Sequence, residues 1–201
     1  MTRLLASPRT PPATGLPVGP LRTVPNYVTL VRSALAVALG TVALSTGDLA
    51  LLAVAYAVYW AGDILDGWSA RRLGQETRLG AVLDIVGDRA CTAILCGGLV
   101  THVSGVVPVA VVFLLTFLVL DAMLSLAFLC WPLLSPNYFY RVDAGVWRLN
   151  WSTPAKAANT AGVVGALLLG LSWAALAIAV GVFVVKLWSA ARVLRLLDAR
   201  C

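Results

Sequence analysis

Charged residues are scarce in this chain. Lys, Arg, Asp and Glu make up 12% of its 201 residues, and 60% of the residues are hydrophobic. Soluble domains carry about 25% charged residues, so this composition, with a mean hydropathy of +0.90, excludes an ordinary water-soluble domain. At roughly 20 residues per span, the length accommodates about six transmembrane helices and no separate soluble domain.

Disulfide and metal-binding cysteine motifs are also missing. Cys91, Cys96, Cys130 and Cys201 have no metal-ligand spacing, and three of them lie in or beside apolar runs, which predicts buried thiols. Residues 1–24 are rich in Pro, Thr and Arg and lack an apolar run of signal-peptide length. We expect them to form a disordered cytoplasmic tail that is retained.

The apolar segments predict an all-α membrane bundle over residues 25–198. Six spans are expected, at 28–46, 49–71, 80–102, 106–132, 155–170 and 173–196. The break near Gly170 is weak, so a single helix over 155–196, and five spans in all, is the alternative.

Charge placement favours six spans with both termini in the cytoplasm. The inner segments then hold Arg3, Arg9, Arg22, Arg71, Arg72, Arg78, Arg141, Arg148, Arg192, Arg195 and Arg200. The outer turns contain no Lys or Arg, which is the asymmetry that the positive-inside rule predicts. We therefore expect a multi-pass protein of the cell membrane. Its net charge of +6 would contact anionic lipid in the bilayer and no nucleic acid.

Four carboxylates lie within the predicted spans. An ionised side chain there costs at least ~2.5 kcal/mol, yet the second span contains Asp63 and Asp66, and the third contains Asp84 and Asp88. Each pair lies on one helical face, because residues three or four apart line up. A short loop joins the two spans, so they should form an antiparallel hairpin that brings both pairs to one depth.

Four aspartates at one depth form a site suited to Mg²⁺ or Mn²⁺, which prefer hard oxygen ligands. One or two such ions would neutralise the buried charge. A membrane cation transporter is the rival interpretation, because intramembrane aspartates also form ion pathways. A pathway needs polar groups through both halves of the bilayer, whereas the outer halves of these spans are almost entirely apolar.

A longer motif surrounds the aspartates. It reads Asp63-Ile-Leu-Asp66-Gly67-Trp-Ser-Ala70-Arg71, then after eight residues Gly80, Asp84 and Asp88. All eight defining positions match the signature of the CDP-alcohol phosphotransferase family in type and spacing. The chain resembles that family over residues 25–195. The resemblance implies a membrane enzyme of phospholipid biosynthesis, with six spans and a site that faces the cytoplasm.

The resemblance also implies a reaction and its residues. The enzyme would transfer a phosphatidyl group from CDP-diacylglycerol to an alcohol and release CMP, with Asp88 as the general base. The metal ligands that it implies are Asp63, Asp66, Asp84 and Asp88. The nucleotide contacts that it implies are Asp66, Gly67, Ala70, Arg71 and Gly80.

Two further runs resemble parts of the same family. Pro25-Asn26-Tyr-Val-Thr29-Leu-Val-Arg32 is similar to the opening of its lipid branch. Pro154-Ala-Lys156-x-x-x-Thr160 is similar to the start of its fifth span, with Ala155 in place of the usual Gly. We expect Asn26, Arg32 and Lys156 to line the acceptor site. The alternatives are a helix start with an interfacial arginine, and a snorkelling lysine.

The acceptor alcohol is not fixed by the sequence. The basic residues Arg32, Arg141, Arg148 and Lys156 favour a polyol phosphate, such as glycerol 3-phosphate or inositol 1-phosphate. A lipid acceptor such as phosphatidylglycerol is the alternative.

Three further features are left with open roles. Asp121 and Lys186, in the middle of the fourth and sixth spans, either serve the site or pair with each other. The stretch 135–153 is either an aromatic anchor or a flap over the site. Assembly as a homodimer is left open.

Overall fold

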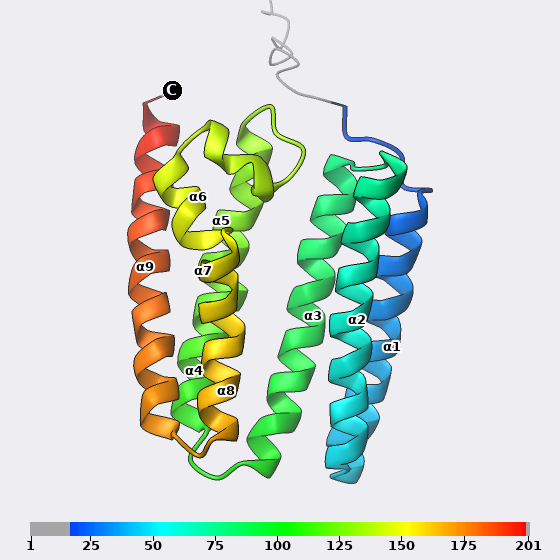
Figure 1. The fold of residues 1–201 in the computed structure, drawn as a ribbon, viewed down its shortest axis with the longest axis vertical. Helices are drawn as coiled ribbons and strands as arrows, with labels where there is room; N and C mark the ends of the chain where they lie inside the picture. The colour runs from blue at the N-terminus through cyan, green and yellow to red at the C-terminus, as the bar shows by residue number, and fades with distance from the viewer. Residues whose placement is uncertain (1–16, 200–201) are drawn as a thin grey trace, which may run out of the picture.

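The computed structural model describes residues 17–199, and within this range every regular element is a helix. The all-α prediction is therefore confirmed for these residues. Figure 1 shows the helices in two groups. The first consists of α1 (Val24–Thr46), α2 (Leu49–Leu73) and α3 (Arg78–His102). The second consists of α4 (Val107–Leu114), η1 (Leu115–Asp121), α5 (Ala122–Leu126), η2 (Ala127–Cys130), η3 (Pro136–Arg141), α6 (Ala144–Asn150), α7 (Thr153–Ala157), η4 (Ala158–Gly162), α8 (Val163–Leu168) and α9 (Ser172–Asp198).

Local sequence sets the ends of the first helices. The side chains of Thr23 and Asp48 accept backbone N–H groups at the starts of α1 and α2, and Pro25 lies in the first turn of α1, where a missing N–H costs nothing. Gly47 and Gly74 end the two helices with φ of 70° and 62°. That left-handed conformation favours glycine, so short connections follow both helices.

Four stretches among residues 17–199 are long and apolar enough to cross a membrane: Val24–Thr46, Leu49–Leu73, Val107–Cys130 and Ser172–Asp198. They correspond to the predicted first, second, fourth and sixth spans. Helix α3 has 25 residues but does not qualify, because polar residues such as Asp88 and Arg89 lower its hydropathy. The run from α7 to α8 is shorter than the roughly 20 residues that cross a bilayer. The count of six spans therefore stays a prediction.

Helix α1 packs closely against both α2 and α3. A Cβ atom at Gly62 of α2 would lie 2.5 Å from Cβ of Arg32, and one at Gly87 of α3 would lie 2.5 Å from Oγ of Ser33. Real Cβ contacts are longer, so only glycine permits this approach. Gly62 thereby allows the stem of Arg32 to pack against α2, and Gly87 allows Ser33 of α1 to pack against α3.

Residues 1–16, most of the predicted disordered tail, lie outside the described residues. The segment just after them has a defined path over the α2–α3 loop. The carbonyl of Val18 accepts the N–H of Leu79 at 3.0 Å, and Nδ2 of Asn26 donates to the carbonyl of Leu21 at 2.9 Å. Ordered contacts therefore begin ahead of residue 25.

An aromatic core lies at one end of the second group. Phe139 is fully buried, and its ring centroid lies 5.3 Å from that of Trp131 and 5.2 Å from that of Trp151. The stretch 135–153 therefore folds back into the protein as η3 and α6. The hydroxyl of Tyr138 donates to Glu76 at 3.0 Å, which joins this stretch to the α2–α3 loop.

The close approach of α1 predicts a position-dependent effect of one methyl group. Gly62→Ala should lower the thermal unfolding midpoint in detergent, because overpacking against Arg32 costs about 1–3 kcal/mol. Gly97→Ala is the matched control, since nothing lies within 4 Å of a Cβ at that position. Equal midpoints for the two variants would contradict the packing described here.

Candidate active site

The two acidic pairs converge, as the hairpin geometry predicted. Asp63 and Asp66 come from α2, and Asp84 and Asp88 come from α3. Carboxylate oxygens of Asp63, Asp66 and Asp84 all lie within 4.8 Å of one another. The side chains of Asp63 and Asp84 are 42% and 41% exposed, so a ligand can reach them. Asp88 lies outside this group of three but shares a counter-ion with it.

That counter-ion is Arg32 of α1, whose side chain is 3% exposed. Its Nε donates to Oδ2 of Asp66 at 2.7 Å. Its Nη2 lies 2.6 Å from Oδ1 of Asp84, 3.0 Å from Oδ1 of Asp88 and 3.3 Å from Oδ1 of Asp63. Four carboxylates around one guanidinium leave an excess of three formal negative charges. A further cation can therefore be accommodated at this position.

The donor set fits a small divalent ion. Carboxylate oxygens are the ligands that Mg²⁺ and Mn²⁺ prefer. Two ligands on opposite sides of Mg²⁺ lie about 4.2 Å apart, because each is about 2.1 Å from the ion. Carboxylate oxygens of Asp63, Asp66 and Asp84 lie within 4.8 Å of one another, which is near that value. These three side chains could hold the ion, and the role of Asp88 as a ligand stays a prediction.

Two residues that the sequence analysis did not assign to the site support Arg32 and its partners. The hydroxyl of Thr29 donates to Oδ2 of Asp66 at 2.8 Å. The guanidinium carbon of Arg32 lies 5.5 Å from the ring centroid of Tyr59, within the range of a cation–π contact. Thr29 belongs to the motif that contains Arg32, and Tyr59 precedes Asp63 by one helical turn. Their positions in the sequence could therefore have assigned both residues to the site.

The predicted nucleotide contacts come from two helices, α2 and α3. Gly67 and Ala70 are half-buried on α2. The exposed Arg71 covers Gly67, with Nη1 at 3.3 Å from where a Cβ would stand. Gly80 of α3 is covered by Asn26, whose Oδ1 would lie 2.6 Å from a Cβ there. Their contact with a nucleotide stays a prediction.

The three predicted acceptor residues lie in different surroundings. Arg32 binds the aspartates directly. Asn26 is 2% exposed, and its Nδ2 donates to the carbonyls of Pro20 and Leu21, so it holds the segment before α1. Lys156 of α7 is exposed, donates to Oδ1 of Asn137 at 3.1 Å and interacts electrostatically with Asp63. Their acceptor roles stay predictions.

A second charged cluster joins α3 to the second group. Asp121 forms ion pairs with both Lys186 of α9 and Arg89 of α3, which confirms the pairing of Asp121 with Lys186. The guanidinium carbon of Arg89 also lies 4.0 Å from the ring centroid of Phe117. The sequence reasoning missed Arg89, although its place next to Asp88 was a signal.

Comparison with known proteins decides the family. The model of the CDP-alcohol phosphatidyltransferase family matches residues 22–188. That range covers most of the chain and includes Arg32, all four aspartates and Lys156. The chain belongs to the CDP-alcohol phosphatidyltransferase family. The family that the aspartate motif resembled is therefore confirmed.

Two relatives within the family match shorter segments. Phosphatidylinositol phosphate synthase of Corynebacterium glutamicum is 37% identical over 79 residues, which are 39% of this chain and 36% of that protein. CDP-diacylglycerol–inositol 3-phosphatidyltransferase 1 of Arabidopsis thaliana is 40% identical over 74 residues, which are 36% of this chain and 31% of that protein. The matched segment thus spans about a third of each relative's length. No solved structure matches the chain.

The position of Arg32 among the four aspartates predicts that the stability of an Arg32→Gln variant depends on divalent metal. Removing one partner of a buried ion pair costs about 3–5 kcal/mol, so Arg32→Gln should lower the unfolding midpoint sharply in the presence of a chelator. Mg²⁺ or Mn²⁺ should restore much of the loss, because a bound cation would replace the missing charge.

Arg72→Gln is the control for this measurement, since Arg72 is exposed on α2 and lies outside the cluster. Its unfolding midpoint should equal that of the wild type both with chelator and with metal. Unchanged stability of Arg32→Gln in chelator would show that the four carboxylates do not depend on this guanidinium.

Proposed function

We propose that this protein transfers a phosphatidyl group from CDP-diacylglycerol to a polyol phosphate in a divalent-metal-dependent reaction that releases CMP. The observation that carries the proposal is the convergence of Asp63, Asp66 and Asp84, with Asp88 beside them, in a chain of the CDP-alcohol phosphatidyltransferase family. Family membership indicates the reaction class. The acidic cluster could hold the divalent ions that would bind the diphosphate of the substrate.

The proposed topology is six spans with both termini in the cytoplasm. The α1–α2, α3–α4 and α8–α9 connections lie at one end of the molecule, opposite the α2–α3 loop and the C-terminus (Figure 1). They contain no Lys or Arg, whereas Arg71, Arg72 and Arg78 flank the α2–α3 loop. This asymmetry supports a cytoplasmic α2–α3 loop. The aspartates would then lie in the cytoplasmic half of the bilayer, within reach of a water-soluble nucleotide head.

The proposed metal ligands are Asp63, Asp66 and Asp84, for one or two Mg²⁺ or Mn²⁺ ions. When bound, such an ion neutralises the negative charge of the diphosphate and of the departing CMP. Arg32 fixes the orientation of Asp66 through Nε. Gly67, Ala70 and Arg71 would form the wall against which the CDP group binds.

Asp88 is the proposed general base. It would accept the proton of the acceptor hydroxyl while the hydroxyl oxygen attacks the phosphorus that carries the diacylglycerol. The bond from that phosphorus to the CMP oxygen breaks, and CMP leaves with the electron pair. The side chain of Asp88 is 20% exposed and lies beside the other three aspartates. An acceptor hydroxyl could therefore reach it next to the proposed metal site.

A phosphorylated inositol is the proposed acceptor. Both relatives are named for inositol lipids, and one of them for phosphatidylinositol phosphate. The charge of the exposed Lys156 acts on Asp63, and it would attract the acceptor's phosphate. These observations favour inositol 1-phosphate over glycerol 3-phosphate, and both over a lipid acceptor such as phosphatidylglycerol.

The purified protein should release CMP from CDP-diacylglycerol only with Mg²⁺ or Mn²⁺ and a suitable acceptor. Asp88→Asn should retain CDP-diacylglycerol binding but lose about 100-fold or more in turnover, because a general base contributes about that much. The control is Asp198→Asn at the exposed end of α9, which should turn over normally. Full turnover by Asp88→Asn would remove Asp88 as the base.

The acceptor panel should contain inositol 1-phosphate, glycerol 3-phosphate, inositol and phosphatidylglycerol. Lys156→Ala should raise KM for the preferred polyol phosphate about ten-fold with little change in kcat, because a charge-assisted contact to a spectator phosphate contributes to binding alone. Any turnover with unphosphorylated inositol should not change. An unaltered KM for every phosphorylated acceptor would refute the role of Lys156.

A further inference from the structure

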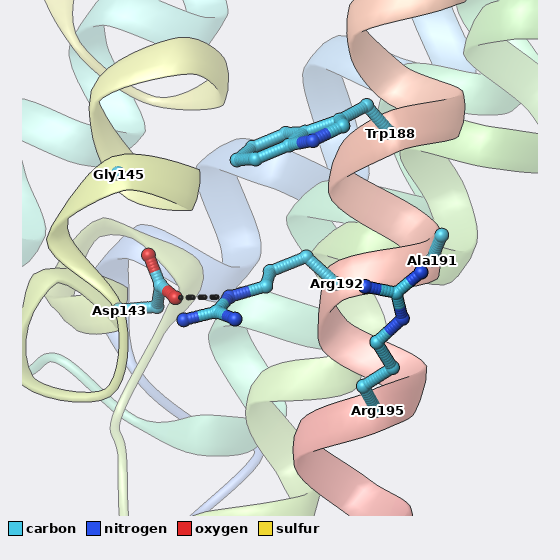
Figure 2. Close-up of a pocket in the computed structure, with 6 residues that line it drawn as sticks. All are labelled: Asp143, Gly145, Trp188, Ala191, Arg192 and Arg195. Carbon is cyan, nitrogen blue, oxygen red and sulfur yellow. Dashed lines mark hydrogen bonds and ion pairs between the residues drawn. The ribbon is translucent and has the colours of Figure 1, made fainter.

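A cavity of about 340 Å³ lies between α6 and α9, near the C-terminal end of α9. Its lining residues are Asp143, Gly145, Trp188, Ala191, Arg192 and Arg195. Figure 2 shows Trp188 and Arg192 extending from α9 toward α6, with Arg195 one turn further along α9. The cavity shares no residue with the candidate active site, so it requires a separate explanation.

Two arginines give the cavity a net positive charge. Oδ2 of Asp143 accepts a hydrogen bond from Nε of Arg192 at 3.1 Å, and Oδ1 of Asp143 accepts the N–H of Val146 at 2.9 Å. Burial acts to raise the pKa of Asp143, but these hydrogen bonds hold that pKa below its usual value. Asp143 therefore stays ionised and neutralises Arg192. Within residues 17–199, the guanidinium of Arg195 forms no hydrogen bond or ion pair.

The same side of α9 continues as an apolar stripe. Val180, Val184 and Trp188 are spaced four residues apart, and all three are exposed, so they line one face of the helix. Arg192 extends that face into the cavity. Exposed valines suit the acyl region of a bilayer, and tryptophan is enriched at the level of the lipid head groups. The stripe thus runs from an acyl-chain surface to a cationic cavity.

We propose that this cavity binds the phosphate of an anionic phospholipid, whose acyl chain lies along Val180 and Val184. Arg195 supplies the uncompensated charge and a planar guanidinium suited to two phosphate oxygens. Arg192 is held by Asp143 and contributes less. Basic cavities beside transmembrane helices on the cytoplasmic side are suited to acidic head groups. The site is distinct from that of the substrates and is independent of catalysis.

Phosphatidic acid is the probe, with phosphatidylcholine and inorganic phosphate as comparisons, and bound molecules are counted by native mass spectrometry of the delipidated full-length protein. Wild-type protein should bind phosphatidic acid more tightly than either comparison. Arg195→Gln should weaken that binding about ten-fold, the loss expected for a charge-assisted contact. Arg72→Gln removes an equal charge at the same end of the molecule and should leave the affinity unchanged.

Asp143→Asn provides a test of opposite sign. Asparagine caps a helix about as well as aspartate, so α6 should keep its place while Arg192 is released. Binding of phosphatidic acid should then tighten about five-fold, roughly the effect of one basic residue near an anionic lipid. A general loss of folding cannot produce such a gain.

Three results would overturn the proposal. Equal losses in Arg195→Gln and Arg72→Gln would indicate nonspecific attraction to a basic surface. Inorganic phosphate bound as tightly as phosphatidic acid would show that no lipid is recognised. Equal binding of phosphatidylcholine would show that the head-group charge is not recognised. None of these results involves turnover, and Asp88→Asn should bind phosphatidic acid as the wild type does, so failure here is separable from failure of the proposed enzyme activity.

Discussion

The buried guanidinium of Arg32 among four carboxylates is the interaction on which the first three helices depend. An arginine inside an apolar bundle requires counter-charges, and isolated carboxylates there require a cation. Helices α2 and α3 supply the four carboxylates, and α1 supplies the arginine. The pairing therefore fixes the rotation and depth of all three helices. Gly62 makes the arrangement sterically feasible, because its missing side chain leaves space for the stem of Arg32.

The same cluster connects stability with the proposed chemistry. One guanidinium does not balance four carboxylates, and the surplus of negative charge is what would attract a divalent ion. Arg32 holds the carboxylates together, and the exposure of Asp63 and Asp84 keeps them accessible. A site with enough cations to be neutral would be more stable by itself but would have no electrostatic reason to bind metal.

Helix α3 carries charges on two sides and so links the two groups. Asp84 and Asp88 face Arg32, whereas Arg89 faces Asp121, which also binds Lys186. Asp84 and Asp88 pair with Arg32 of α1, and Arg89 pairs with Asp121 of the second group. The hydropathy of α3 is lower because it carries these charged residues, which contact polar partners on both sides of the helix. At the end with the α2–α3 loop, the contact of Tyr138 with Glu76 adds a second link between the groups.

The sequence by itself determined the helical class, the four aspartates and their convergence, because helical periodicity and a short connecting loop act over neighbouring residues. It offered the Asp121–Lys186 pair as one of two alternatives. Only the tertiary structure decided that Arg32 lies among the aspartates and that Arg89 joins Asp121. These contacts depend on how closely the helices pack, which is set by side-chain volumes at positions such as Gly62 and Gly87. No local sequence pattern shows which residues of another helix pack against those positions.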